Sequence, residues 1–225
     1  MNHAILLLDY GHGGLVDGKY QTNGKYYTFL NSDEPLTVYE GVVQRAIAAQ
    51  LIGLLLDAGV RVFDVVLGAE WHRAPTWQEL EQYDVPLRTR VDRANRHPDG
   101  LYLSLHSNAV GNVNQGKGRS ARGVEMYTSK GQTGADAVAD SLIGAFRKRF
   151  AEHKLPIRRG DWRDGDVDME QNFYVLRKTL MPAVLGEVGF FTNILDASIL
   201  VSEEGQRAIA EAYAAGVLPH LEASA

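Results

Sequence analysis

Short apolar runs alternate with helical periodicity along most of the chain. An apolar run of about four to eight residues between turn residues is typical of a buried strand, and apolar residues three or four positions apart are typical of a helix. By this criterion, strands are predicted at residues 4–8, 60–67, 101–105, 124–128 and 182–188. Helices are predicted at residues 40–58, 87–96, 134–150 and 203–218. Because the two kinds alternate, we expect an α/β fold with a mostly parallel, twisted sheet that helices flank on both faces.

Polar segments separate these elements. Residues 15–39 are rich in Gly, Tyr and Asn, residues 153–172 are rich in charge, and both are predicted to be long loops. Residues 111–123 are predicted to form a shorter, glycine-rich loop. No repeat, low-complexity stretch or linker divides the sequence. We therefore expect a single domain over residues 1–225, with its core at residues 4–218.

The composition excludes several classes of protein. The chain has 225 residues and no cysteine, so a bound metal would have to be held by histidines and carboxylates. The net charge of -5 argues against nucleic acid as the partner, because such domains usually carry a basic face. No apolar run is long enough to cross a membrane, and the run before Asp9 is too short for a signal peptide. We expect no membrane insertion, and synthesis in the cytoplasm without a standard export signal.

Candidate chemistry lies at the ends of the predicted strands, where ligands bind in open α/β sheets. The first strand runs into a glycine-rich turn that contains His12, and the third strand ends at His106. The last predicted strand carries Glu187 within an apolar run. Two histidines and one glutamate with a water form a common catalytic zinc shell, and a further carboxylate nearby would serve as a general base. Glu40, at the start of the first predicted helix, is a further candidate, but the spacing of these four residues alone is not diagnostic of a zinc hydrolase.

Each of these residues also has a structural interpretation. A histidine at a strand end is often a hydrogen-bonded structural residue, and Glu40 would suit the first turn of a helix, where negative charge complements the macrodipole. Glu187 requires a cation, a metal or a shifted pKa, since burying an unpaired carboxylate costs on the order of several kcal/mol. An ion pair with Arg90 or Arg177 would explain it without any catalytic role.

Several segments, in order along the chain, resemble the motifs of one family. They include residues 9–14 (DYGHGG, with Tyr10 where the family has proline), 87–95 (LRTRVDRAN), 104–108 (SLHSN), 123–127 (GVEMY), 173–177 (FYVLR) and 181–193 (MPAVLGEVGFFTN). On these motifs the chain resembles the zinc-dependent N-acetylmuramoyl-L-alanine amidases of the amidase-3 type, which cut peptidoglycan. The resemblance runs from about residue 4 to residue 218 and so covers nearly the whole chain.

The resemblance implies hydrolysis of the amide between the lactyl group of N-acetylmuramic acid and L-alanine of the stem peptide. It implies one zinc ion (Zn2+) per chain, held by three side chains: His12, Glu40 and His106. Glu187 would be the general base, and we expect substrate contacts from Asn108 and Arg90. Glu34 is a rival for the position of Glu40. We prefer Glu40 because it directly precedes the helical periodicity, whereas Glu34 stands before Pro35 in a turn.

Two other functions remain open from the sequence: another zinc peptidase acting on stem peptides, and a non-catalytic wall-binding module. For the amidase we expect peptidoglycan as the partner, a monomer, and no separate wall-binding domain. Without a signal peptide, the chain resembles a phage lysis enzyme (an endolysin), released onto the cell wall through a pore. A bacterial enzyme exported by a non-classical route would have the same appearance.

Overall fold

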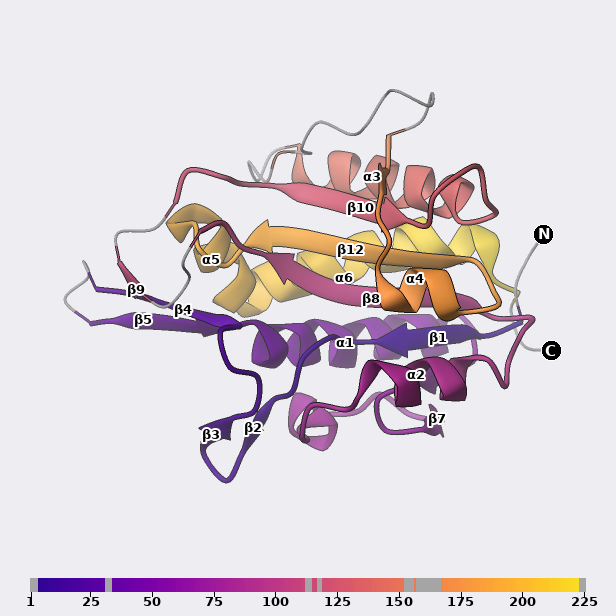
Figure 1. Ribbon diagram of the computed structural model, residues 1–225, viewed down its shortest axis with the longest axis horizontal. Coiled ribbons are helices and arrows are strands. Elements are labelled where there is room, and N and C mark those ends of the chain that lie inside the picture. Colours follow the sequence, from indigo (N-terminus) through magenta and orange to yellow (C-terminus); the bar gives the residue numbers. More distant parts are fainter. Residues whose placement is uncertain are drawn as a thin grey trace.

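A seven-stranded sheet forms the middle layer of the molecule (Figure 1). This computed structural model describes residues 4–30, 34–111, 115–116, 119–151, 156 and 167–222. In sheet order, the strands are β11 (Met169–Glu170), β10 (Val124–Thr128), β12 (Ala183–Phe190), β8 (Leu101–Asn108), β1 (Leu6–Asp9), β6 (Val62–Asp64) and β7 (Ala69–Trp71). The central strands β12, β8, β1 and β6 are mutually parallel, and antiparallel pairing occurs where β10 meets β12 and where β7 meets β6. The expected mostly parallel sheet is confirmed.

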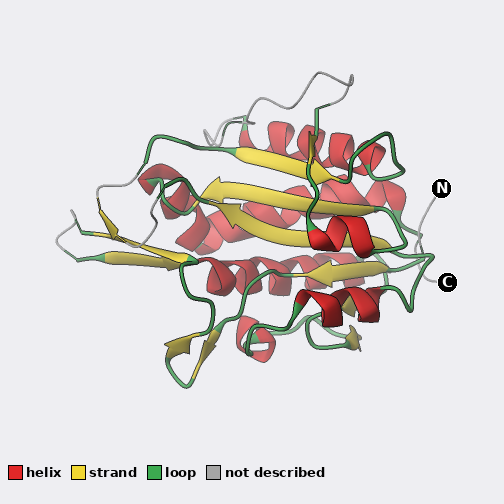
Figure 2. Cartoon of the chain, in the orientation of Figure 1, coloured by secondary structure: helices red, strands yellow, loops and turns green. Residues whose placement is uncertain are grey.

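Helices cover both faces of this sheet (Figure 2). One face carries α1 (Glu40–Asp57), α3 (Asp136–Phe150) and α6 (Glu203–Val217), and the other carries α2 (Leu87–Ala94) and α4 (Tyr174–Lys178). The remaining helical elements are α5 (Ile194–Val201) and the 3-10 turns η1 (Trp77–Leu80) and η2 (Leu218–His220). The α/β class with flanking helices is thus confirmed. Among the described residues, no helix has both the length and the apolar character needed to cross a bilayer.

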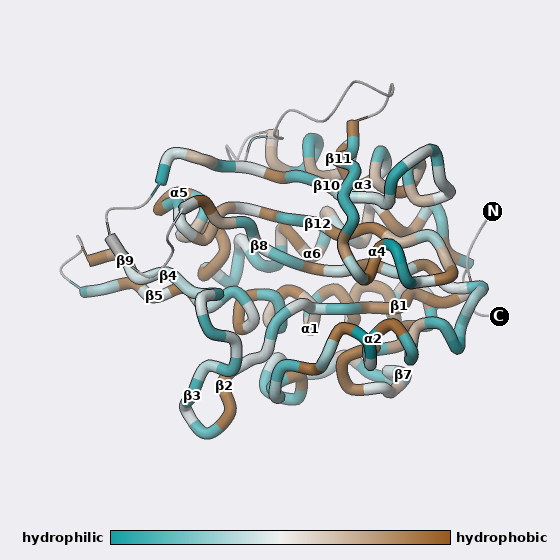
Figure 3. The backbone as a smooth tube through the Cα atoms, viewed as in Figure 1, coloured by the Kyte–Doolittle hydropathy of each residue, from teal (hydrophilic) through white to brown (hydrophobic). Residues whose placement is uncertain are grey.

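The apolar patterns explain these elements. Leu6, Leu7 and Leu8 are all 0% exposed, as a strand covered on both faces requires, and the tube in Figure 3 is coloured hydrophobic there. The helix α1 buries Ile47 and the other apolar residues at its helical spacing. It ends at Asp57, and Gly59, just beyond the C-cap Ala58, has a φ of 75° in the left-handed region that glycine adopts at little cost. The predictions for these elements are confirmed to within a few residues.

The prediction of a loop over residues 15–39 is wrong. This segment contains β2 (Leu15–Val16), β3 (Lys19–Tyr20), β4 (Tyr26–Phe29) and β5 (Leu36–Tyr39). β2 and β3 form a hairpin, while β4 and β5 join β9 (Gln115–Gly116) in a three-stranded sheet. The physical reason is burial at alternate positions: Tyr27, Phe29 and Val38 are all at most 3% exposed, while residues between them are less buried.

Shorter elements also lie where the pattern predicted none. The helices α4 and α5 flank β12, and β11 lies within the predicted 153–172 loop. Most of that predicted loop, residues 153–155 and 157–166, lies outside the described residues. The helix α5 begins because the Asn193 side chain accepts hydrogen bonds from the N–H groups of Leu195 and Asp196, at 3.0 and 3.4 Å.

We predict that replacing glycine with alanine has opposite effects on stability at Gly186 and at Gly144. Gly186→Ala should lower the free energy of unfolding by about 1–3 kcal/mol, because a Cβ there would lie 2.3 Å from the hydroxyl of buried Tyr213. Gly144→Ala should instead raise it by up to about 1 kcal/mol, since Gly144 is exposed in α3 with open space around it. Urea unfolding of both variants tests this. Equal shifts in the two midpoints would contradict the packing of α6 against β12.

Candidate metal centre

Three side chains converge at the carboxyl end of the central strands. His12 follows β1, Glu40 is the first residue of α1, and His106 lies in β8. One potential ligand atom from each lies within 4.8 Å of the other two. His106 Nδ1 is 3.0 Å from Glu40 Oε1, and His12 Nε2 is 3.5 Å from Glu40 Oε2. The rival Glu34 is exposed and not part of this group.

Segment 15–39 holds the start of α1 in place. The N–H of Glu40 donates to the carbonyl of Lys25 at 3.0 Å, and the N–H of Gly41 donates to the hydroxyl of Tyr20 at 2.9 Å. The N-cap residue Tyr39 makes no capping bond with its own side chain. The rings of Tyr20, Tyr26 and Tyr39 pack together, with centroids 4.8 to 6.3 Å apart. The position of Glu40 therefore depends on contacts from distant parts of the chain.

The burial of these ligands fits a divalent cation. Glu40 is 0% exposed, and its Oε1 lies 3.2 Å from the donating N–H of Ser107. Its Oε2 and the facing His12 Nε2 are buried without a hydrogen-bond partner in the described part of the chain. Buried polar atoms are rarely left unsatisfied, so two such atoms facing each other indicate a missing ligand. Imidazole nitrogens and a carboxylate oxygen are donors that suit zinc.

Electrostatics holds two of these ligands in the form that binds a metal. Burial lowers the pKa of His12 to about 4, which keeps its imidazole neutral at neutral pH. Burial alone would raise the pKa of Glu40, but His12 and His106 beside it hold that pKa at about 2. A neutral imidazole and an ionised carboxylate are the species that ligate metals. Burial opposes protonation of His106, yet the hydrogen bond and the charge of Glu40 raise its pKa.

Glu187 lies beside these ligands on the sheet. In the parallel pairing of β12 with β8 it is opposite His106, and in the antiparallel pairing with β10 it is opposite Glu125. Paired residues project from the same face of a sheet, so the carboxylate of Glu187 adjoins the cluster. Burial raises its pKa to about 7, with the charge of His106 opposing and that of Glu40 adding. Within the described residues its Oε2 has no hydrogen-bond partner, and such a group suits proton transfer near neutral pH.

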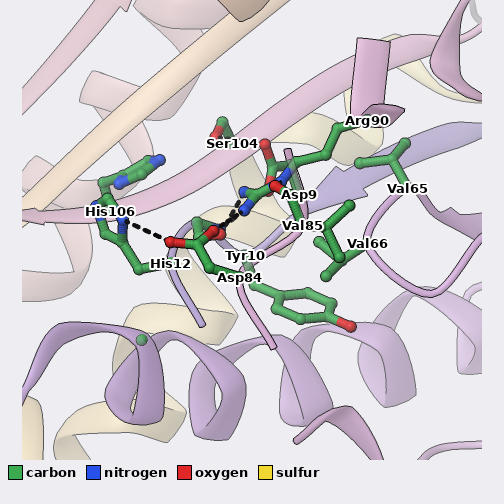
Figure 4. Close-up of polar contacts among 12 residues, drawn as sticks. Asp9, Tyr10, His12, Val65, Val66, Asp84, Val85, Arg90, Ser104 and His106 are labelled. Carbon is green, nitrogen blue, oxygen red and sulfur yellow. Dashed lines mark hydrogen bonds and ion pairs between the residues drawn. The ribbon is translucent and has the colours of Figure 1, made fainter. Parts of the chain in front are cut away.

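The arginines proposed as ion-pair partners of Glu187 are engaged elsewhere or exposed. Arg177 is exposed on α4, whereas Arg90 is only 2% exposed and lies 2.7 Å from each of Asp9 Oδ1 and Asp84 Oδ1. Asp84 Oδ2 in turn lies 4.0 Å from His12 Nδ1, so Asp84 stands between Arg90 and His12 (Figure 4). Arg90 and Asp84 therefore form a charged pair beside the His12 ring. A contact between Arg90 and a substrate stays a prediction.

Asn108 ends β8 near the same cluster and is partly exposed. Its amide nitrogen donates to Glu125 Oε2 at 2.7 Å, and its Oδ1 accepts from the N–H of Ala109 at 2.8 Å. Glu125 also accepts a hydrogen bond from the hydroxyl of Tyr127 at 2.9 Å. Asn108 therefore has a fixed orientation at the edge of the cluster, and its contact with a substrate stays a prediction.

Two buried residues of α1 support the cluster although the sequence analysis did not single them out. The Arg45 guanidinium donates to the carbonyls of His12, Gly41 and Leu80. The Gln44 amide donates to Ser107 Oγ at 2.6 Å. Both side chains are 0% exposed. Gln44 was detectable, because it lies at helical spacing from the apolar Ile47 and so faces the sheet.

Comparison with known proteins finds related chains along the whole sequence. The family described as N-acetylmuramoyl-L-alanine amidase matches residues 6–218. An uncharacterized cell wall amidase of Bacillus anthracis is 30% identical over 219 residues, which are 96% of this chain and 35% of that protein. The chain likewise spans less than two thirds of other curated relatives, for example 45% of the amidase CwlM of Bacillus licheniformis.

Solved structures share the fold. The N-acetylmuramoyl-L-alanine amidase AmiC2 of Nostoc punctiforme is 26% identical, with a TM-score of 0.67 over 97% of this chain and 98% of that one. An N-acetylmuramoyl-L-alanine amidase from Clostridium difficile 630 has a TM-score of 0.70 at 24% identity, over 97% of both chains.

Arg90 and Arg88, two arginines of α2, provide a matched test of the buried ion pair. Arg90→Met should lower the free energy of unfolding by about 3–5 kcal/mol, because it leaves Asp9 charged and buried. Arg88→Met should change it by less than about 0.5 kcal/mol, since the Arg88 side chain is 84% exposed. Chemical denaturation measures both. A stable Arg90→Met variant that loses only substrate affinity would contradict the structural role and favour a substrate contact.

Proposed function

The chain belongs to the N-acetylmuramoyl-L-alanine amidase family, and from this we propose that it cleaves the amide between the lactyl group of N-acetylmuramic acid and L-alanine in peptidoglycan. The observation that carries the proposal is the cluster of His12, Glu40 and His106 with the carboxylate of Glu187 beside it. A metal-binding cluster next to a carboxylate poised for proton transfer is what hydrolysis of an unactivated amide needs.

The metal that we propose is a single zinc ion per chain, held by His12, Glu40 and His106. The support comes from the donor set, the absence of cysteine, and the facing atoms of His12 and Glu40, which make no hydrogen bond among the described residues. When bound, such an ion acts as a Lewis acid that polarises a carbonyl and acidifies water. Asp84 would hold the His12 ring from its other nitrogen, with Arg90 fixing Asp84.

Glu187 would move the proton during the reaction. Its carboxylate takes a proton from the attacking water, whose oxygen forms the new bond to the lactyl carbonyl carbon. The same proton then passes to the nitrogen of L-alanine as the carbon–nitrogen bond breaks, leaving a lactyl carboxylic acid and a free amine, and the acid's proton then passes to the amine. The raised pKa of Glu187, about 7, makes both halves of this transfer feasible near neutral pH. Asn108, at the edge of the cluster, is the residue that we propose contacts the substrate.

Peptidoglycan is the partner that this proposal requires, with the chain acting as a monomer on the cell wall. The main competitor is a zinc peptidase that cuts within the stem peptide, and the second is a wall-binding module without activity. The products separate all three, because only an amidase frees intact stem peptides from the glycan.

Glu187→Gln should lower the rate of stem-peptide release by about 100-fold or more, since the amide cannot accept the proton. Mass spectrometry of digested peptidoglycan follows the released peptides, and the bound zinc should stay at the wild-type level. Glu204→Gln, which changes an exposed carboxylate of α6, is the matched control and should leave the rate unchanged. Full activity of the Glu187→Gln variant with normal zinc content would disprove the assigned role.

His12→Ala and His106→Ala should each lose zinc, because each removes one of the three protein ligands. Metal analysis of dialysed protein is expected to find about one zinc ion per chain in the wild type, as a single three-ligand centre implies. His72→Ala, at an exposed histidine outside the cluster, should keep that content. Equal zinc in all three variants would place the metal elsewhere.

A further inference from the structure

Lys25 approaches the carboxylate at the centre of the cluster. Its Nζ lies 3.6 Å from Glu40 Oε2, the same oxygen that faces His12 Nε2 at 3.5 Å and has no hydrogen-bond partner among the described residues. The Lys25 side chain is 41% exposed, whereas that of Glu40 is fully buried. The partly exposed ammonium group of Lys25 therefore reaches the carboxylate oxygen of Glu40 that a metal ion would bind.

The backbone around Lys25 fixes this approach. The Lys25 carbonyl accepts the N–H of Glu40, and the Lys25 N–H donates to the carbonyl of Thr22 at 3.4 Å. Gly24, with a φ of 76°, allows the tight turn between Thr22 and Lys25. The hydroxyl of Thr22 accepts from the N–H of Gly13 at 2.9 Å and donates to Asp84 at 2.7 Å. The turn is thus tied to both the His12 loop and the start of α1.

We propose that Lys25 is a stand-in cation, which pairs with Glu40 Oε2 while no metal is bound and must withdraw when a metal ion takes that oxygen. The proposal rests on the metal centre proposed above but not on which bond the enzyme cleaves. Its consequence is that Lys25 lowers the affinity of the cluster for metal while it stabilises the metal-free protein.

The lower metal affinity and the higher stability of the metal-free protein both follow from the positive charge of the Lys25 ammonium group. A buried carboxylate without a counter-charge is costly, so the Lys25 ammonium offsets part of the cost of burying Glu40 in the metal-free protein. A divalent cation at Glu40 Oε2 would repel an ammonium at this distance. Because the lysine stem is long and partly exposed, the ammonium can move into solvent at little cost. The free energy of metal binding must nevertheless offset the loss of the ion pair between Lys25 and Glu40.

Lys25→Met tests the proposal in zinc-stripped protein. The variant should bind zinc about fivefold more tightly than the wild type, the size expected for one ion pair that is partly screened by solvent. Without zinc it should melt about 2–4 °C lower than the wild type. Lys25→Arg keeps the charge and should preserve both properties. Lys19→Met, at an exposed lysine of β3 in the same segment, is the matched control and should change neither.

Zinc affinity is measured by competition with a fluorescent chelator, and thermal unfolding is followed by circular dichroism with and without zinc. Tighter zinc binding together with a lower melting temperature in Lys25→Met alone supports the proposal. Zinc affinity equal to or weaker than that of Lys19→Met overturns it while leaving the metal centre intact. An unchanged melting temperature of the metal-free variant also overturns it. Failure of every variant, wild type included, to bind zinc overturns the metal centre and this proposal together.

Discussion

The rest of this site depends on how the buried carboxylate of Glu40 is stabilised. A fully buried carboxylate is stable only where positive or hydrogen-donating groups surround it, and here His106, the backbone N–H of Ser107 and Lys25 do so. This requirement brings the loop after β1, the strand β8 and the start of α1 together at one end of the sheet. Glu187 completes the arrangement because its strand pairs in register with β8.

The segment between His12 and Glu40 belongs to the site as much as the strands do. Tyr20 and Lys25 bind the first two N–H groups of α1, and Thr22 joins the same turn to Gly13 and Asp84. A helix start without its own capping side chain needs such partners, and in this chain they come from the β2–β5 region. The position of Glu40, and hence any metal centre built on it, is therefore set by residues that never touch the metal.

Much of this structure could be predicted from the sequence, and the parts that could not share a physical cause. The run Leu6–Leu8 and the spacing of Ile47 and its neighbours predict their elements, because burial dictates the pattern locally. The strands β2–β5 are two to four residues long, and β4 pairs with distant β9, so local periodicity carries little signal. Arg45 was missed for a similar reason: its partners are backbone carbonyls that only the folded chain brings together. The family motifs, by contrast, pointed to residues that the structure brings together at His12, Glu40 and His106.

Anomalous diffraction from a zinc-loaded crystal would show directly whether a metal ion binds between His12, Glu40 and His106. We expect one strong anomalous peak at the zinc edge, about 2.0–2.2 Å from a nitrogen of each histidine and an oxygen of Glu40. In the same map, the ammonium of Lys25 should have moved away from Glu40 Oε2. A peak at any other group of side chains, or no peak in protein shown to contain zinc in solution, would rule out a metal centre at these residues.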